Sequence, residues 1–463
     1  MLSSVRKFLE RIVRFFYPVI AVSGAHRIPS AGSVVVVSNH PNGLIDPVTI
    51  GLGLARPVAF LAKGTLFGNP VSRLLMDAFG AIPVYRAVDG QGTGRNQETF
   101  AICRKRLLEG GWIAIFPEGT THDDPAMKPF KTGAARIALE AQADAGDDQS
   151  VKILPVGLLY EDKHIFRSRL ALSVGEPIDV REQAREAPAD PKAAAEHFTA
   201  VIHEALGAVT LEAENRELWR GFMAVAAWTD RDADEDLALR ETRARSLARA
   251  YRQLVTADPL RAGEVVDITR RFVRMLQSVG IDDPLHLEGS DRPTLAALAG
   301  SLFSLLMMAP VALVGAVLSW IPYRLVKPLA HLAAGGKVEL IGTFKVLIGL
   351  VIMTITYVTE AVLFGSWFGW PVGLATLVIA PATGFIALRF HERLSLRREA
   401  LRAYWLRSTR ARVAVEIRKR RRELARLVEV ALKEVLPESA GSSVEPGANA
   451  QTEPGGNVGA PIR

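Results

Sequence analysis

The sequence of 463 residues contains one cysteine, Cys103. A single cysteine excludes an internal disulfide and fits a reducing compartment. Because Cys103 lies in the helical pattern NQETFAICRKRLLEGG, we expect it to pack in a core rather than to act as a nucleophile. We also expect no secretory signal peptide, since the apolar stretch FFYPVIAV is short and no small-residue cleavage site follows it.

Charged residues are absent from Leu295 to Ile321, and Glu360 is the one charge inside the two apolar stretches that follow. Segments of this length and composition are typical of membrane helices. Within a membrane region at 294–389, we predict three membrane segments, at 296–321, 346–366 and 368–389.

Basic residues flank these segments on both sides. The loop 321–345 carries an arginine and three lysines, and the chain after Leu388 is far more basic. Both should face the cytoplasm. We therefore favour a re-entrant or interfacial hairpin at 296–321, broken at Pro310, and a spanning hairpin at 346–389 that turns at Trp367 and Trp370. Three simple spans are the alternative.

The chain carries a net charge of +7, which suits nucleic acid, anionic lipid or an anionic substrate. Much of the charge lies in an arginine-rich helix predicted at 390–436, with IRKRRREL at its centre. We favour a juxtamembrane helix on anionic lipid, worth about 1 kcal/mol per basic residue near the surface, over a nucleic-acid site. Residues 437–463 are predicted to be a disordered tail.

Residues 1–16 predict a basic amphipathic helix. Leucine, valine, isoleucine and phenylalanine side chains gather on one face, and Arg6, Lys7, Arg11 and Arg14 lie on the other. This pattern is typical of a helix lying in a membrane interface. The alternative is a helix that packs on the neighbouring domain.

Residues 17–185 alternate short β-rich runs with helical patterns, which predicts an α/β domain. The runs are SVVVVS, PVAFLA, AIPVY, WIAIF, KILPVGLLY and RLALSVG. Residues 186–293 are helical and highly charged, and we assign no chemistry to them.

The stretch SNHPNGLIDP (Ser38–Pro47) ends the first of these runs. His40 and Asp46 are too far apart to meet on one helix or one strand, so they can touch only if the chain doubles back at Pro-Asn-Gly. One interpretation is a working histidine–aspartate pair. The other is that His40 merely ends a strand and Asp46, followed by proline, caps a helix.

Three further blocks follow in order: GAIPVYR, ending at Arg86; IFPEGTTHDDPAMKPFKTG, from Ile115; and ILPVGLLY, from Ile153. With the His-to-Asp block, they resemble the glycerophospholipid acyltransferase family. Five residues separate His40 from Asp46, where the commonest members have four, and Thr121-His122-Asp123 replaces the usual Arg-Ser. Both departures resemble the branch that includes fungal glycerol-3-phosphate/dihydroxyacetone-phosphate acyltransferases.

The resemblance implies an α/β acyltransferase domain, a mixed sheet flanked by helices, at 17–185. It implies transfer of an acyl group from a thioester to a glycerol hydroxyl, with His40 as general base and Asp46 holding the imidazole. The substrate hydroxyl takes the place of an enzyme nucleophile. The implied substrate-binding residues are Asn39, Lys63, Arg86, Glu118, Gly119, Thr120 and Lys131, with Lys63 and Arg86 as candidates for the phosphate.

We expect no metal and no cofactor, with acyl-CoA or acyl carrier protein as co-substrate. The expected partners are the bilayer, an acyl donor and a glycerol-phosphate or lysophospholipid acceptor, without nucleic acid. Glycerol-3-phosphate, dihydroxyacetone phosphate and 1-acyl-glycerol-3-phosphate remain open as acceptors. We expect the protein at the inner membrane, with its catalytic domain in the cytoplasm. The alternatives are transfer to another lysophospholipid and a membrane scaffold with a decayed enzyme domain, against which the presence of His40, Asp46 and Glu118 argues.

Overall fold

The computed structural model describes residues 2–85, 96–145, 149–230, 236–288 and 295–435. Arg86 and the predicted tail 437–463 lie outside the described residues. An eight-stranded sheet forms the centre of the first part of the chain, in the order β1-β7-β6-β2-β5-β3-β4, with β8 paired to β6. The strands are β1 (Val19–Ser23), β2 (Ser33–Ser38), β3 (Ala59–Lys63), β4 (Ile82–Val84), β5 (Trp112–Ile115), β6 (Val151–Tyr160), β7 (Arg169–Val174) and β8 (Ile178–Asp179).

The sheet is mixed, as predicted. The five neighbours β6, β2, β5, β3 and β4 are parallel, whereas β7 and β8 run antiparallel to β6. All six predicted runs form strands. The edge strand β1, parallel to β7, was not predicted, because its partner lies far along the chain (Val19 pairs with Arg169). The five parallel strands all end at the same edge of the sheet, which is where loops carry function in such folds.

The alternation of side chains along β2 explains how helices cover both faces. Val34 and Val36 point into one hydrophobic core, and Val35 and Val37 into the other. The first core packs against α2, and the second against α4, α5 and α7. Cys103 is buried in the second core, which raises the pKa of its thiol to about 12, as suits a packing residue.

The helices of this domain are α2 (Ile45–Gly53), α3 (Pro70–Ala78), α4 (Asn96–Leu108), α5 (Gly133–Ala145), α6 (Val180–Glu186) and α7 (Pro191–Val209), with 3₁₀ turns η1 (Ala25–Arg27) and η2 (Gly64–Phe67).

The N-terminal helix α1 (Leu2–Phe16) packs on the sheet domain, which was the alternative prediction, and its place in a membrane interface stays a prediction. Val13 and Phe16 are buried in the first core, so the helix packs on the domain. Phe8 and Phe15 lie on another face and are 53% and 52% exposed. The ring of Phe15 also lies 5.9 Å from that of Phe385 in the C-terminal helices. The helix is therefore anchored to the domain and presents a second apolar surface.

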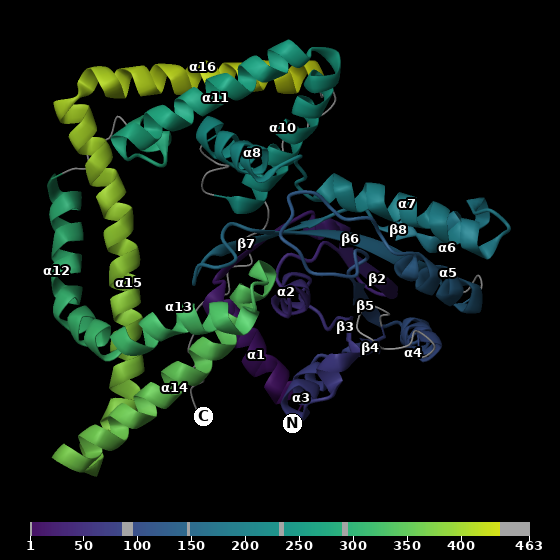
Figure 1. Ribbon diagram of the computed structural model, residues 1–463, viewed down its shortest axis with the longest axis horizontal. Coiled ribbons are helices and arrows are strands. Elements are labelled where there is room, and N and C mark those ends of the chain that lie inside the picture. Colours follow the sequence, from purple (N-terminus) through teal and green to yellow (C-terminus); the bar gives the residue numbers. More distant parts are fainter. Residues whose placement is uncertain (1, 86–95, 146–148, 231–235, 289–294, 436–463) are drawn as a thin grey trace, which may run out of the picture.

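The charged middle region and the arginine-rich helix form one layer. Figure 1 shows α16 (Ala411–Val435) lying along α11 (Pro259–Val279), near α8 (Arg216–Thr229) and α10 (Leu237–Ala257). Ile417 and Leu424 are buried in a core shared with these helices. Arg421 bonds to the carbonyl oxygen of Trp228 and forms an ion pair with Glu288, just after the turn η5 (Pro284–Leu287).

The helix predicted at 390–436 is divided in two in the structure. The helix α15 (Trp370–Thr409) continues unbroken to Thr409, and α16 begins at Ala411. Arg421 of α16 is used in packing against the helical region. Contact of this basic region with anionic lipid stays a prediction.

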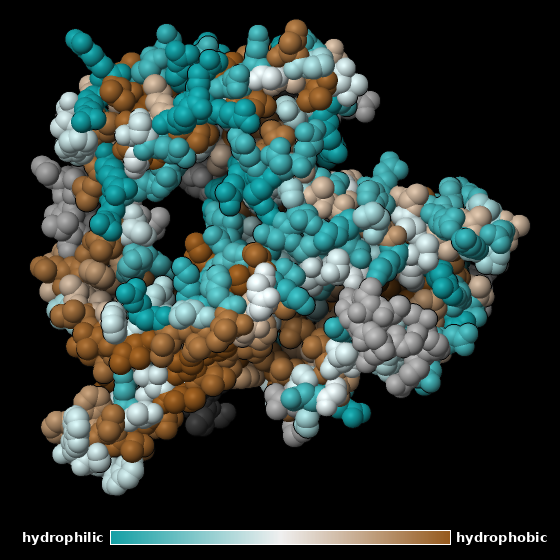
Figure 2. Space-filling view, viewed as in Figure 1, coloured by the Kyte–Doolittle hydropathy of each residue, from teal (hydrophilic) through white to brown (hydrophobic). Residues whose placement is uncertain are grey.

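The C-terminal apolar region forms α12 (Leu295–Leu318), α13 (Trp320–Ala334), the turn η6 (Val338–Leu340), α14 (Ile341–Phe368) and α15 (Trp370–Thr409). Two helices, α14 and α15, are long and apolar enough to cross a membrane. They turn back at Gly369, whose φ of +91° favours glycine, between the two predicted tryptophans. Figure 2 shows hydrophobic side chains gathered over α13, α14 and the lower part of α12.

The predicted break at Pro310 is wrong. Helix α12 runs unbroken through Pro310, and the chain bends by 53° at Ser319, between α12 and α13. A proline inside an apolar helix is tolerated when neighbouring elements support that helix, and α12 packs along α15. At this crossing Gly315 contacts the backbone at Thr383 with no room for a methyl group.

A glycine in the sheet gives a test of this packing. A Cβ on Gly157 in β6 would lie 1.9 Å from the carbonyl oxygen of Val209, at the end of α7. We expect Gly157→Ala to lower the free energy of unfolding by about 1–3 kcal/mol or more, as overpacked cores do. As a control, Gly263→Ala in α11 meets nothing within 4 Å, and it should raise stability slightly through helix propensity. Equal thermal midpoints for both variants in detergent would contradict the packing described here.

Candidate active site

The edge of the sheet at which the parallel strands end brings two of the motifs together. β2 and β5 are parallel neighbours in register at their ends, where Val37 pairs with Ile115. His40 follows the end of β2, and Glu118 follows the end of β5. The backbone N–H of His122 donates to the carbonyl oxygen of His40 at 3.2 Å and joins the two loops. The sheet therefore delivers both motifs to one place.

The chain doubles back at Pro-Asn-Gly, as predicted. Gly43 has a φ of +38°, and the N–H of Ile45 donates to the carbonyl oxygen of Asn42 at 3.0 Å as α2 begins. The helix cap was predicted wrongly. The N-cap position is Leu44, and Asp46 lies inside the first turn with its side chain directed back to the preceding turn.

His40 and Asp46 are in contact. Nδ1 of His40 lies 2.8 Å from Oδ2 of Asp46, which is fully buried. The backbone N–H of Asn42 donates to the same oxygen at 2.7 Å. An aspartate held in this way fixes the tautomer of its histidine, with the proton on Nδ1. The geometry of the predicted pair is thus confirmed, and its catalytic role stays a prediction.

Tyr160 completes the surroundings of Asp46, and the sequence analysis did not find it. Its hydroxyl donates to Oδ1 of Asp46 at 2.6 Å. Burial, followed by the nearby charge of Asp46, raises the pKa of Tyr160 well above its usual value, so the phenol keeps the proton that it donates. Tyr160 reaches this position because β6 continues past the end of β2, where Ser38 pairs with Val156.

The imidazole of His40 is oriented by packing as well. Its ring stacks on Phe116 with the centroids 3.9 Å apart and the planes 12° from parallel. The side chain is 16% exposed, and among the described residues its one side-chain hydrogen bond is the one from Nδ1 to Asp46. Nε2 is therefore available to a substrate.

One carboxylate oxygen of Glu118 accepts hydrogen bonds, and the other has no partner among the described residues. Oε2 accepts the backbone N–H of Lys128 at 2.7 Å and pairs with Nε2 of His122. Oε1 is buried, and no hydrogen bond from the described part of the chain reaches it. The described residues include no group of three or more histidine, cysteine, aspartate or glutamate side chains placed to hold a metal ion.

Lys131 reaches the Pro-Glu-Gly turn. A Cβ on Gly119 would lie 2.8 Å from Nζ of Lys131, so the lysine side chain lies against this turn, and the φ of Gly119, +66°, favours glycine. Thr120 is exposed beside it. The structure thus brings Glu118, Gly119, Thr120 and Lys131 together, as predicted.

The other predicted substrate contacts differ in outcome. Both polar atoms of the Asn39 amide bond to the backbone of Leu158, at 3.0 and 2.7 Å, so Asn39 joins the ends of β2 and β6, and its predicted contact with substrate stays a prediction. Lys63 is the last residue of β3, at the same edge of the sheet as His40. Arg86, predicted to hold the phosphate, lies outside the described residues.

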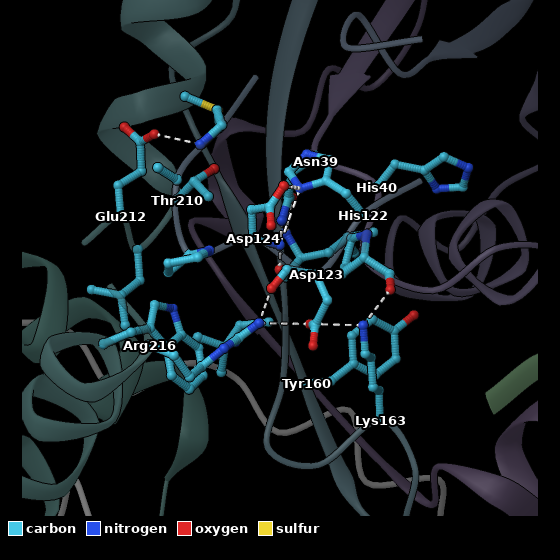
Figure 3. A pocket seen from close by; sticks show the side chains of 18 of the residues that line it. Asn39, His40, His122, Asp123, Asp124, Tyr160, Lys163, Thr210, Glu212 and Arg216 are labelled. Carbon is cyan, nitrogen blue, oxygen red and sulfur yellow. Dashed lines mark hydrogen bonds and ion pairs between the residues drawn. The ribbon is translucent and has the colours of Figure 1, made fainter. Parts of the chain in front are cut away.

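A cleft of about 210 Å³ opens at this site, between the sheet domain and α8, and His40 and Glu118 are among the residues that line it. Figure 3 shows Asp123 between Lys163 and Arg216, with the imidazole of His40 pointing away from them. The carboxylate of Asp123 lies 2.7 Å from Lys163 and 2.9 Å from Arg216. Burial alone would raise the pKa of Asp123, but these two cations outweigh it and lower the pKa. Lys163 also donates to the carbonyl oxygen of Pro41 at 2.9 Å, so the cluster supports the turn after His40.

Comparisons with known proteins agree with this site. Residues 19–159 match the family described as Acyltransferase. The chain is 26% identical over 296 residues to an uncharacterized acyltransferase of Schizosaccharomyces pombe, covering 45% of this chain and 44% of the relative. It is 45% identical over 85 residues to glycerol-3-phosphate O-acyltransferase 2 of Saccharomyces cerevisiae, covering 18% of this chain and 11% of the relative.

A third relative is the 1-acyl-sn-glycerol-3-phosphate acyltransferase of Borreliella burgdorferi, 28% identical over 156 residues, which cover 34% of this chain and 57% of the relative. The chain thus spans from about a tenth to just over half the length of these relatives. The second and third of these matches are shorter than the sheet domain at 17–185. The segment at 19–159, which holds His40, Asp46 and Glu118, is therefore an acyltransferase domain similar to those of glycerol-3-phosphate and 1-acyl-sn-glycerol-3-phosphate acyltransferases.

Proposed function

We propose that the protein transfers a fatty acyl group from a thioester donor to a hydroxyl of a glycerol-phosphate acceptor at a membrane. The observation that carries the proposal is the contact between His40 and the buried Asp46, which leaves Nε2 of His40 open. An alcohol is a poor nucleophile at neutral pH and needs a positioned base, and histidine suits that task.

The reaction follows from this arrangement. Nε2 of His40 takes the proton of the acceptor hydroxyl as its oxygen attacks the thioester carbonyl carbon. Asp46, which accepts hydrogen bonds from the backbone of Asn42 and the hydroxyl of Tyr160, stabilises the imidazolium. Collapse of the tetrahedral intermediate breaks the carbon–sulfur bond, and the imidazolium returns the proton to the leaving thiolate. The products are an ester and a free thiol.

The acceptor is proposed to be glycerol-3-phosphate or 1-acyl-glycerol-3-phosphate, because relatives are named for each. Lys63, Arg86 and Lys131 are proposed to hold its phosphate, and Oε1 of Glu118 to accept a glycerol hydroxyl. The donor is proposed to be acyl-CoA or acyl carrier protein. An assay of membranes containing the protein, with each acceptor against each donor, distinguishes these combinations.

The membrane arrangement is proposed to have two crossings, by α14 and α15. α13 leads through η6 into α14, whose first turn is buried against the sheet domain. Arg167 of the sheet domain pairs with Glu392 of α15 at 2.5 Å, so α15 returns to the same side. Since η5, which precedes α12, packs against α16, both ends of the bent pair α12–α13 also lie on the side of the sheet domain.

The first functional test is His40→Ala. Loss of a general base should lower kcat by about 10² to 10⁴ on every active acceptor. His26→Ala is the control, because His26 is exposed in η1, away from the site. Thermal midpoints should show that both variants are folded. Activity of His40→Ala close to that of the unmodified protein would refute the assignment.

Tyr160→Phe tests the support of Asp46. A hydrogen bond to a charged group contributes about 1.5–3 kcal/mol, so losing the Tyr160 hydroxyl should lower kcat by about tenfold. Tyr404→Phe removes a hydroxyl from an exposed position on α15 and should leave kcat unchanged. If both variants matched the unmodified enzyme, the hydroxyl of Tyr160 would have no part in holding Asp46 for catalysis.

Topology is tested by single cysteines in a Cys103→Ala background. Ala333, Ser366 and Ser408 are exposed, near the end of α13, the Gly369 turn and the end of α15 respectively. In intact cells, a membrane-impermeant thiol reagent should label Ser366→Cys alone. Ala333→Cys and Ser408→Cys should react after the cells are opened. Labelling of Ala333→Cys in intact cells would show that α12–α13 crosses the bilayer.

A further inference from the structure

The start of α14 lies directly on the turn that carries His40 and Asp46. A Cβ on Gly342 would lie 2.7 Å from Oδ1 of Asn42 and 2.9 Å from the carbonyl oxygen of Lys163. From the other side, a Cβ on Gly43 would lie 2.9 Å from Oγ1 of Thr343. Asn42 and Thr343 are both buried. The two segments therefore fit together with no room for a methyl group on either glycine.

The Pro41–Gly43 turn reached by α14 is the one that holds Asp46. The backbone N–H of Asn42 donates to Oδ2 of Asp46, the oxygen that pairs with His40. The side-chain amide of Asn42 donates to the hydroxyl of Tyr17 at 3.0 Å, and that hydroxyl donates to the carbonyl oxygen of Lys163 at 2.9 Å. A shift of Asn42 would therefore move a backbone N–H that donates directly to Asp46, the carboxylate that orients His40.

The same helix enters the apolar region almost at once. Nζ of Lys345 donates to the carbonyl oxygen of His164 at 2.6 Å, and the predicted membrane segment begins at residue 346. From Gly342 to that point the helix rises about 6 Å. The contact with the turn and the predicted membrane boundary thus lie about one helical turn apart.

We propose that Leu340–Thr343 of the membrane hairpin is a positioning element for the His40–Asp46 pair. The hairpin is then part of the catalytic structure, and it holds the reacting groups close to the level of the lipid headgroups. An anchor that only tethered the enzyme would need no close fit to the active-site turn. This inference rests on the proposed acyl transfer and names residues that act through Asn42 and Asp46.

The test compares two glycine-to-alanine changes in one helix. Gly342→Ala adds a methyl group against Asn42, whereas Gly349→Ala adds one in ordinary contact with Val326, 3.9 Å away. Both changes raise helix propensity equally. We expect Gly342→Ala to lower kcat by about 10- to 100-fold, because a displacement of order 1 Å can cost about 10² in rate. The KM values of both substrates should change less than about twofold, and Gly349→Ala should keep the original kcat.

A double variant tests the route through Asn42. Asn42→Ala removes the side-chain amide that the new methyl group would meet, so Gly342→Ala should cost less kcat in that background than alone. Equal costs in both backgrounds would show that the effect does not pass through Asn42. If Gly342→Ala did not fold, Leu340→Ala would be used instead, since it loosens the contact with Gly43 without adding atoms. It too should lower kcat with unchanged KM values.

The outcomes separate this inference from the proposed function. An inactive His40→Ala together with equal kcat for Gly342→Ala and Gly349→Ala would overturn the inference and leave the proposed function standing. An active His40→Ala would overturn the proposed function. Loss of kcat in Gly342→Ala and Gly349→Ala alike would show a general need for the hairpin rather than positioning by its first turn.

Discussion

The buried carboxylate of Asp46 is the interaction on which the site depends. A charged group without water is costly unless it is fully hydrogen-bonded. Asp46 meets this need with His40, the backbone of Asn42 and the hydroxyl of Tyr160. These partners come from the end of β2, the Pro-Asn-Gly turn and the end of β6. The sheet must bring all three together before the carboxylate can be buried. The same strand ends therefore complete both the sheet and the hydrogen bonds around Asp46.

Much of this could be predicted from local sequence. The valines of β2 and the apolar run of β6 each indicate a strand, and Pro-Asn-Gly indicates the turn that lets His40 reach Asp46. Tyr160 could not be found in this way, because its role depends on how far β6 extends beyond β2. The edge strand β1 could not be predicted either, because its partner β7 lies far away in the sequence. Contacts set by register or by long-range pairing leave no periodic signal.

The membrane region shows the same division between local composition and packing. Apolar composition located α14 and α15, and the tryptophans located their turn at Gly369. Composition misplaced the break in the preceding segment, because the support that α15 gives to α12 around Pro310 depends on tertiary packing. Composition also did not indicate that α16 packs in the helical layer, because the burial of Ile417 and Leu424 depends on residues far along the chain.

The polar atoms of the site fall into two groups, and the difference indicates where a substrate would bind. Asp46 and Asn39 have their hydrogen bonds satisfied within the protein, and both hold backbone turns in place. Oε1 of Glu118 is buried without a partner among the described residues, and Nε2 of His40 is open. An unpaired buried oxygen costs about 1–3 kcal/mol. Of the two proposed acceptors, glycerol-3-phosphate carries two hydroxyl groups, one for each position, whereas 1-acyl-glycerol-3-phosphate carries only the hydroxyl that reacts.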